Sequence, residues 1–467
     1  MDNLTIFDLM YEQYKITKPI RLIEFFAGYG SQAFALKYLG VPFEHWRICE
    51  WAVPSIQAYK DAHFTNNNID YSKCFTKEYI IEVLYNNGIS MDYNQPMKLE
   101  QIKRMSEEQL RTIYNNILAT NNLVNIQKVK GERLDIVEQD KYTYVLTYSF
   151  PCQDLSLAGK GKGMSRDGGT RSGMLWEVER ILDECNELNC LPQVLLMENV
   201  PQVIGEKNIK DFQSWREKLE NLGYSNYIEV LNAKHYGIPQ NRERAFMISI
   251  FGEYNYTFPK KIPLELKLKD MLEKSVDEKY YLSDKMIKFF YENEKKQKEK
   301  GNGFKFGVSD GNCIAKTITT RAGSRMDDNY IDMQKSLKET LENNNIEDID
   351  NVAYIDAYNR NIRKDEISCA ITTRVNDSNN SYLLIKEATK KGMCQTLKTS
   401  IDVGVVVKDE NKSRIRKLTP KECFRLMGVK DEDYENIAKN QSNSKLYHLA
   451  GDSIVVNVLM GIFKEMM

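Results

Sequence analysis

The sequence IRLIEFFAGYGS at positions 20–31 decides the fold of this chain. Its first seven residues form the apolar pattern of a buried strand, and AGYGS at 27–31 has the composition of a tight turn. Residues 32–39 have helical composition, and WRICE at 46–50 is a second short strand. This order of strand, turn, helix and strand predicts a β-α-β unit, whose two strands must run parallel.

The same alternation of strands and helices resumes after residue 142. The pattern predicts helices at 174–188 and 211–222, and strands at 142–149, 194–197, 227–231 and 245–251. Strands that alternate with helices predict an α/β fold, in which a mostly parallel sheet is covered by helices on both faces.

Three further regions do not belong to this alternation. Residues 65–124 are rich in Asn, Glu, Lys and Tyr with helical patches, and we interpret them as an insertion that forms a helical flap. After residue 258 the Thr-rich segments CIAKTITTR (313–321), CAITTR (369–374) and CQTLKT (394–399) are similar to one another. They predict a small strand-built domain, with chance similarity of short segments as the alternative. The apolar segment 454–462 predicts a helix that packs back on the first sheet.

Size and composition restrict the class of protein. The 467 residues, 42% hydrophobic and 28% charged, are typical of a soluble globular protein with two or three domains. The first residues lack the pattern of a signal peptide, and no apolar stretch is expected to span a bilayer. Nine cysteines without a Cys-x-x-Cys pair and only four histidines give little support to a zinc site. We therefore expect a cytoplasmic protein with reduced thiols and no metal.

The formal net charge of −1 argues against a protein that coats polyanions indiscriminately. It leaves nucleic acid open as a partner, because binding requires a local basic face and not a basic total.

A cysteine lies directly after a predicted strand. Pro151, Cys152 and Gln153 follow the apolar run 144–150, and the polar, glycine-rich segment 154–163 comes next. A cysteine directly after a strand is well placed to act as a nucleophile, and the segment after it could close over a substrate. The alternative is that Cys152 is a small buried hydrophobic residue, as free cysteines often are.

The first β-α-β unit also carries a nucleotide-binding pattern. Gly28-x-Gly30-x-x-Ala33 lets backbone approach a ligand at a helix N-terminus. Glu50 ends the next strand and can accept bonds from ribose hydroxyls, while Trp51 offers a flat face for adenine or, alternatively, is a core tryptophan. These residues indicate an adenosine-containing cofactor, and a nicotinamide-dependent oxidoreductase stays open.

Two later motifs place charged groups where a parallel sheet builds its sites. Glu198 and Asn199 end the apolar strand that begins at 194. Arg242 and Arg244 are two residues apart, so they lie on one side of an extended segment, as catalytic groups or as a surface ladder of ion pairs.

Taken in order, these motifs resemble those of the DNA cytosine-5 methyltransferases of bacterial or phage type. The matching segments are FAGYG (26–30), EW (50–51), FPCQ (150–153), ENV (198–200), QNRER (240–244), RKLTPKEC (416–423) and AGDSIVVN (450–457). The resemblance covers about 20–64, 125–258 and 414–467. It implies a Rossmann-like, S-adenosylmethionine-dependent methyltransferase fold. A catalytic domain would span 1–254, a strand-rich target-recognition domain 255–415, and a C-terminal segment 416–467 would return to the first domain.

The resemblance also implies a reaction and its catalytic residues. Cys152 would add to C6 of a cytosine flipped out of a specific duplex DNA site, Glu198 would stabilise N3, and Arg244 would assist at O2. Arg242, in the same motif, is a further expected catalytic residue. C5 would then receive the methyl group of S-adenosylmethionine, with S-adenosylhomocysteine as product, under a lid formed by 155–173.

The remaining implied roles concern binding. The expected cofactor-binding residues are Phe26, Ala27, Gly28, Gly30, Ser31, Glu50, Trp51, Asn125, Ile126, Pro151, Asp452 and Ser453. The expected DNA-binding residues are Gln153, Ser156, Arg321 and Arg374, with Arg325 as a further candidate in the 255–415 region. Two residues depart from the family pattern: Asn125 stands where the family usually has an acidic residue, and Asp452 where it usually has Asn.

The implied partner is double-stranded DNA, and the implied protein is a monomer of the bacterial cytoplasm or nucleoid. It would act in restriction–modification, with a cognate endonuclease encoded nearby as an option, or in phage or host DNA modification. Two alternatives remain. A transfer RNA cytosine methyltransferase carries a Cys-Phe-Thr tripeptide in its target-recognition region, but here Cys74-Phe75-Thr76 falls inside 65–124. A nicotinamide-dependent oxidoreductase would leave the Pro-Cys-Gln and double-arginine motifs without a role.

Overall fold

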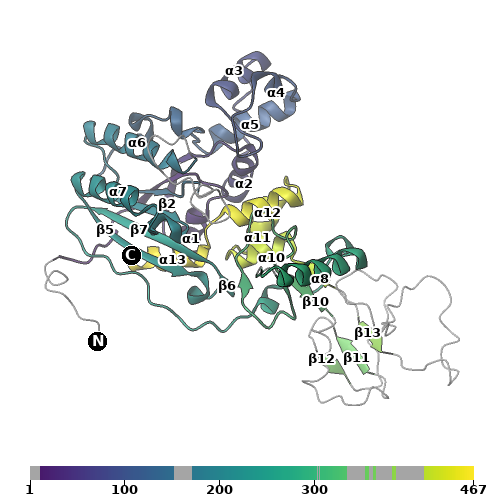
Figure 1. Ribbon diagram of the computed structural model, residues 1–467. Helices are drawn as coiled ribbons and strands as arrows, with labels where there is room; N and C mark the ends of the chain where they lie inside the picture. The colour runs from purple at the N-terminus through teal and green to yellow at the C-terminus, as the bar shows by residue number, and fades with distance from the viewer. Residues whose placement is uncertain are drawn as a thin grey trace, which may run out of the picture. The chain divides into compact units, whose positions relative to one another are not determined.

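The computed structural model describes residues 11–151, 171–301, 303, 305–333, 353–356, 361–363, 381–384 and 415–467 (Figure 1). They fall into two compact units. The first comprises Met1–Leu266, Thr317–Thr320 and Cys423–Met467, and the second comprises Lys267–Lys316 and Arg321–Glu422. The functional division at residues 254 and 415 stays a prediction.

The first unit is built on a six-stranded sheet with the order β2-β1-β3-β4-β7-β5. The strands are β1 (Ile20–Phe25), β2 (Phe43–Cys49), β3 (Thr143–Tyr148), β4 (Val194–Asn199), β5 (Tyr224–Asn232) and β7 (Glu243–Phe251). The first four are mutually parallel, and β7 runs antiparallel to both β4 and β5. The predicted α/β fold with a mostly parallel sheet is confirmed.

Alternating side chains of β1 pack on opposite faces of the sheet. Ile23 and Phe25 belong to the large apolar cluster that includes α6 (Leu175–Glu187) and α7 (Ile209–Asn221). On the other face, Glu24 Oε2 accepts a hydrogen bond from the Tyr59 hydroxyl of α2 (Val53–His63) at 2.5 Å. Because residues of a strand alternate in direction, β1 is buried on both faces, and its pattern is continuously apolar except at Arg21 and Glu24.

The turn after β1 is made of residues in the left-handed region. Phe26, Gly28 and Gly30 have φ values of 58°, 55° and 81°. Gly30 begins α1 (Ser31–Leu39), and a Cβ there would clash with the His63 ring and lie 2.7 Å from Cε2 of Tyr59. Gly30 is therefore required for α1 to pack closely against α2.

Helices from the C-terminal segment complete the first unit. They are α11 (Asp431–Ala438), α12 (Asn443–Asp452) and α13 (Val456–Glu465), while α10 spans Pro420–Leu426. α13 packs against α1, and α11 packs against α2. The helix expected at 454–462 is thus present at 456–465, against a helix that covers the sheet.

Residues 65–124 are helical, as expected. They form α3 (Lys77–Asn87), α4 (Leu99–Lys103) and α5 (Glu107–Ala119), which share an apolar cluster. The Cys-Phe-Thr tripeptide has structural contacts here: Thr76 caps α3 by accepting from the Tyr79 N–H, and Phe75 stacks on Tyr79 with ring centroids 4.6 Å apart. These contacts account for Phe75 and Thr76 without an RNA substrate.

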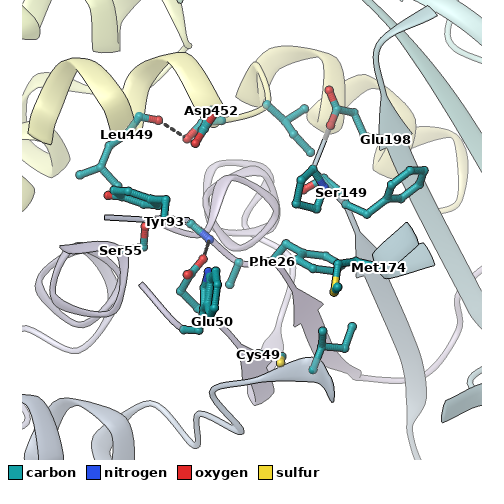
Figure 2. Close-up of a pocket in the computed structure, with 18 of the residues that line it drawn as sticks. Phe26, Cys49, Glu50, Ser55, Tyr93, Ser149, Met174, Glu198, Leu449 and Asp452 are labelled. Carbon is teal, nitrogen blue, oxygen red and sulfur yellow. Dashed lines mark hydrogen bonds between the residues drawn. The ribbon is translucent and has the colours of Figure 1, made fainter. Parts of the chain in front are cut away.

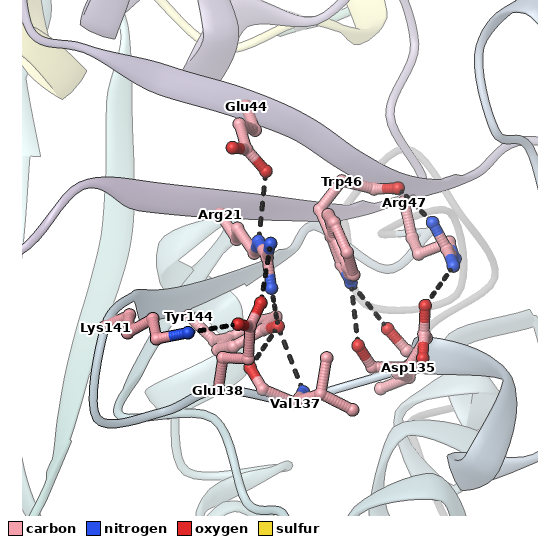
Figure 3. A network of polar contacts seen from close by, with 10 residues as sticks. Arg21, Glu44, Trp46, Arg47, Asp135, Val137, Glu138, Lys141 and Tyr144 are labelled. Carbon is pink, nitrogen blue, oxygen red and sulfur yellow. Dashed lines mark hydrogen bonds and ion pairs between the residues drawn. The ribbon is translucent and has the colours of Figure 1, made fainter.

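A polar network ties the N-terminal ends of the strands together (Figure 3). The Arg21 guanidinium lies between the rings of Trp46 and Tyr142, at 3.8 and 3.6 Å from their centroids. It also donates to the Glu44 carboxylate at 3.0 Å and to the Tyr144 hydroxyl at 2.8 Å. The network therefore joins β1, β2 and β3 at the end of the sheet opposite to their carboxyl ends.

The second unit contains α8 (Asp284–Glu299) and two small sheets, β14-β10-β8 and β12-β11-β13. Their strands are β8 (Val308–Ser309), β10 (Tyr330–Asp332), β11 (Ala353–Asp356), β12 (Asn361–Arg363), β13 (Ser381–Leu384) and β14 (Ile415–Lys417). A further strand, β9 (Ala315–Lys316), belongs to neither of these sheets. A fully buried pair, Arg416 and Glu422, anchors β14 through bonds of 2.7 and 2.8 Å. Of the three Thr-rich segments, 313–321 contains β9, while 369–374 and 394–399 lie outside the described residues.

One described segment, Asn443–Glu465, is long and apolar enough by length and composition to cross a membrane, with a mean hydropathy of 1.5. The sequence-based expectation that no stretch reaches this limit was wrong. The apolar stretch is 72% buried inside the first unit and is divided at Ser453 into α12 and α13. Burial of this extent is typical of core helices.

We expect Gly30→Ala to lower the free energy of unfolding by about 2–4 kcal/mol, because it adds left-handed strain to a clash with α2. Gly40→Ala is the matched control: Gly40 also has a positive φ, 70°, but a Cβ there meets nothing within 4 Å. It should cost only about 1 kcal/mol. Urea unfolding followed by tryptophan fluorescence measures both, and equal losses would contradict the packing role of Gly30.

Candidate active site

The described residues of the first unit enclose a cavity of about 390 Å³ at the carboxyl ends of β1–β4 (Figure 2). Crevices at this edge of a mostly parallel sheet are where α/β proteins bind ligands. All the residues expected to bind the cofactor line it except Gly30, whose role lies in the packing of α1 on α2. The expected catalytic residues Glu198, Arg242 and Arg244 line the same cavity, so the fold brings both groups together.

Glu50 is a buried carboxylate on one side of this cavity. Its Oε2 accepts from the Gly28 N–H at 3.0 Å and its Oε1 from the Ala52 N–H at 2.8 Å. The Asn122 side chain fixes the Glu50 backbone from both sides, by bonds of 3.0 and 2.9 Å. Burial raises the pKa of Glu50 to about 7, although the backbone N–H groups oppose the rise.

The other residues expected to hold the cofactor surround Glu50. Trp51 is half-buried and packs on the apolar cluster of 65–124 while it lines the cavity. Asn125 is buried, and its side-chain oxygen caps a short 3₁₀ helix by accepting from the Gln127 N–H at 3.0 Å. The Ser453 hydroxyl donates to the Leu449 carbonyl at 2.6 Å.

Glu198 and Arg244 form an ion pair on neighbouring antiparallel strands. Glu198 lies near the end of β4, Arg244 lies at the start of β7, and Nε of Arg244 is 3.1 Å from Oε1 of Glu198. Burial raises the pKa of Glu198 above its ordinary value, and the guanidinium groups of Arg244 and Arg242 oppose part of the rise. The pair therefore places a carboxyl that can carry a proton beside a permanent positive charge.

Asn199 joins this pair to the segment that precedes Cys152. Its Nδ2 donates to the Phe150 carbonyl at 2.9 Å, and its Oδ1 accepts from the Val200 N–H at 2.8 Å. The first bond joins the end of β4 to the residues that follow β3, and the second fixes the Asn199 side chain; Pro151 and Glu198 line the same cavity. Cys152, Gln153, Ser156 and Arg374 lie outside the described residues, as does 155–170 of the expected lid.

A sequence model of C-5 cytosine-specific DNA methylases matches residues 101–467. The chain belongs to this family. The predicted activity, DNA cytosine-5 methyltransferase, is thereby confirmed, and the family implies use of S-adenosylmethionine.

Named relatives agree with this assignment. The methylase is 40% identical over 292 residues to the orphan methyltransferase M.SssI of Spiroplasma monobiae. That alignment covers 61% of this chain and 73% of the relative. It is 30% identical over 454 residues to the type II methyltransferase M2.ScrFI of Lactococcus lactis subsp. cremoris, covering 96% and 99%. Among solved structures, S. pombe Dnmt2 has a TM-score of 0.53 at 13% identity, covering 96% of this chain and 98% of that one. That likeness concerns the fold alone.

Arg242 of the methylase makes contacts that differ from those of Arg244. Its buried guanidinium donates to the carbonyls of Ile318 at 2.9 Å, Gly451 at 2.9 Å and Ser453 at 2.7 Å. It thus fastens two distant segments of the first unit at the edge of the cavity. These contacts suit a residue that positions other segments, and the expected catalytic role of Arg242 stays a prediction.

Several lining residues were missed by the sequence reasoning. Tyr93 and its neighbours Asn94, Gln95 and Pro96 come from 65–124, and His448 comes from α12. No motif marked them, and the 65–124 region had been set aside as an insertion. In the second unit, Arg321 is exposed, and Arg325 lies 3.3 Å from the Asp327 carboxylate. Across the described part of the chain, no group of three His, Cys, Asp or Glu side chains could hold a metal ion.

We expect Arg242→Met to lower the free energy of unfolding by about 3 kcal/mol, because three buried carbonyls would lose a charged donor. Arg104→Met, at an exposed position, is the matched control and should change it by less than about 0.5 kcal/mol. Urea unfolding gives both values. An Arg242→Met protein with normal stability and no activity would contradict the positioning role and support the direct catalytic one.

Proposed function

We propose that this methylase modifies C5 of a flipped-out cytosine in duplex DNA, with Cys152 as nucleophile and S-adenosylmethionine as methyl donor. The observation that carries the proposal is the Glu198–Arg244 pair, which shares one cavity with Pro151, Glu50 and Trp51. The carboxyl group, the guanidinium group and the expected cofactor-binding residues therefore line one cavity together with Pro151, the residue that precedes Cys152.

The residues present suit a nucleoside-containing cofactor. The Glu50 carboxylate accepts backbone bonds from Gly28, Ala52 and Trp51, and since a carboxylate has about four acceptor sites, a ribose hydroxyl still has an acceptor available. Trp51 offers an aromatic face at the same side. A Cβ at Gly28 would meet only the Ser453 hydroxyl, at 4.0 Å, so the turn after β1 leaves room beside the backbone. Phe26, Glu50, Trp51 and Asp452 would hold the cofactor, which supplies an electrophilic methyl group when bound.

The chain's own residues would then activate the base. The Cys152 thiolate forms a bond to C6, and the electrons of the C5–C6 double bond move toward C5 and N3. Glu198 in its protonated form donates a hydrogen bond or a proton at N3, and Arg244 stabilises the negative charge that develops at O2. C5 becomes nucleophilic and accepts the methyl group. Loss of the C5 proton and cleavage of the sulfur–C6 bond regenerate the thiolate.

The raised pKa of Glu198 supports this role. A carboxyl whose pKa is raised keeps its proton to a higher pH than a free glutamate, so the donor form is present below that pKa and is lost as the pH rises through it. The Arg244 guanidinium stabilises the deprotonated carboxylate of Glu198 between turnovers.

Duplex DNA would be read by the 255–415 region, with Arg321, Arg325 and Arg374 as candidate contacts. We propose a monomer that acts in the bacterial cytoplasm or nucleoid. Relatives named type II and orphan methyltransferases are both similar to this chain, so the proposed settings are restriction–modification with a cognate endonuclease and DNA modification without one.

We expect Cys152→Ala to abolish methyl transfer and leave S-adenosylmethionine affinity within about twofold, because the thiolate is required for addition at C6 and not for cofactor binding. Cys74→Ala, at an exposed free cysteine, is the matched control. Tritium incorporation into duplex DNA and calorimetric titration of the cofactor give the two readouts. Near-normal turnover of Cys152→Ala would refute the covalent route.

We expect Trp51→Ala to raise the dissociation constant of S-adenosylmethionine about 10-fold, because a buried aromatic contact contributes roughly 1–2 kcal/mol. Trp51→Phe keeps an aromatic face and should lose less than threefold. Calorimetry without DNA measures both, and circular dichroism checks that the fold is intact. Unchanged affinity in a folded Trp51→Ala protein would remove Trp51 from the cofactor site.

A further inference from the structure

The loop 88–98, between α3 and α4, forms part of the cavity wall. Tyr93 lines the cavity, and Asn94, Gln95 and Pro96 line it while being exposed to solvent. Residues that are both exposed and lining lie at the rim of a cavity. The region 65–124 therefore contributes an edge of the opening.

Tyr93 stacks on His448 of α12 at this rim. The ring centroids are 3.9 Å apart and the planes are inclined by 29°. Figure 2 shows Tyr93 on the Glu50 and Ser55 side of the cavity, with Leu449 and Asp452 close by and Glu198 and Met174 on the far side. The stack thus joins two segments about 350 residues apart in the chain, both within the first unit.

The loop that carries Tyr93 is held firmly at its base. The Ser90 N–H donates to the Trp51 carbonyl and the Val53 N–H donates to the Ser90 carbonyl, both at 2.8 Å. Asp92 closes the loop by accepting from the Asn94 N–H at 2.9 Å. Movement of the loop base would therefore disturb the backbone of Trp51, so an opening must occur near the tip.

Tyr93 itself is the strained point of the tip. Its φ is 63°, in the left-handed region that a bulky aromatic residue seldom occupies. Such strain persists only where the surroundings determine it, and it gathers at ligand clamps and switch regions. The stack on His448 holds the ring in this conformation, and the Tyr93 hydroxyl also interacts with the Ser55 side chain.

The other half of the stack is also fixed. Nε2 of His448 lies 3.0 Å from Oδ2 of Asp452 on the same helix. α12 is preceded by Asn440 and Gln441, which donate to the Asp61 carboxylate at 2.9 Å and to the Pro54 carbonyl at 2.8 Å. His448 is therefore a stationary partner against which Tyr93 opens and closes.

We propose that the Tyr93–His448 stack is a clasp over the nucleoside side of the cofactor cavity. It sets the rate at which S-adenosylmethionine enters and S-adenosylhomocysteine leaves. The proposal rests on the proposed function in one respect, that this cavity holds the cofactor. A single ring stack is weak enough to break thermally. While it is formed at the rim of the cavity, it slows the passage of a ligand. It also gives the 65–124 region a role in cofactor retention.

The experiment measures release of S-adenosylhomocysteine from the full-length protein by stopped-flow competition without DNA. Tyr93→Ala and His448→Ala should each raise the dissociation rate about 5–10-fold, and the double variant should raise it no further, because either change removes the same stack. Tyr93→Phe keeps the ring and should stay within twofold of the natural protein. Tyr85→Ala, an exposed tyrosine on α3, is the matched control.

Steady-state kinetics adds a readout that loss of structure would not give. The open clasp should raise KM for S-adenosylmethionine about 5-fold while kcat on DNA is kept or increased, since retention and not chemistry is affected. If Tyr93→Ala fails to fold, His448→Ala, at a partly exposed helix position, carries the same test.

The outcomes are distinguishable. If the natural protein binds neither S-adenosylmethionine nor S-adenosylhomocysteine, the proposed function fails. If it binds both, and Tyr93→Ala and His448→Ala release product at the natural rate, the clasp is overturned and the cofactor site stands. Additive effects in the double variant also overturn it, because they would mean that the two rings act separately.

Discussion

The left-handed turn at 26–30 is the constraint on which the rest of the first unit depends. It ends the central strand β1, brings the Gly28 N–H to Glu50, and lets α1 begin at Gly30 against the rings of α2. A turn of another shape would separate α1 from α2 and would remove the N–H that holds Glu50. The packing of the core and the form of the cavity therefore share one cause.

Two buried carboxyl groups line the cavity, and they have different hydrogen-bond and charge partners. Glu50 is held by backbone N–H groups, and burial raises its pKa to about 7. Glu198 is held by a guanidinium group, and burial raises its pKa against that charge. The first arrangement keeps acceptors fixed for hydroxyl donors, and the second provides a proton donor beside a cation. Placed on one sheet edge, at the ends of β2 and β4 with β1 and β3 between them, they suit the binding of a nucleoside and the activation of a base.

The first strand and the turn after it could be predicted from the sequence, because both depend on residues that are close together in the chain. The continuous apolar pattern of 20–25 reports burial on both faces, and the turn composition of 27–31 reports positive φ values at Gly28 and Gly30. The reversed direction of β7 could not be predicted, since strand direction depends on pairing and not on composition. Arg242 and Arg244 show the same limit within the site. Spacing placed both on one side of a segment, but only the surrounding carbonyls distinguish the arginine that fastens segments from the one that pairs with Glu198.

Tyr93 was beyond prediction for a further reason. Its partner His448 is about 350 residues away, and the sequence around Tyr93 has no pattern of its own. A region without family motifs still lines the cavity here, because its loop is bonded at Ser90 to the motif residue Trp51. The proposed chemistry depends on residues at the sheet edge, while the proposed clasp belongs to a loop that carries none of the expected catalytic residues.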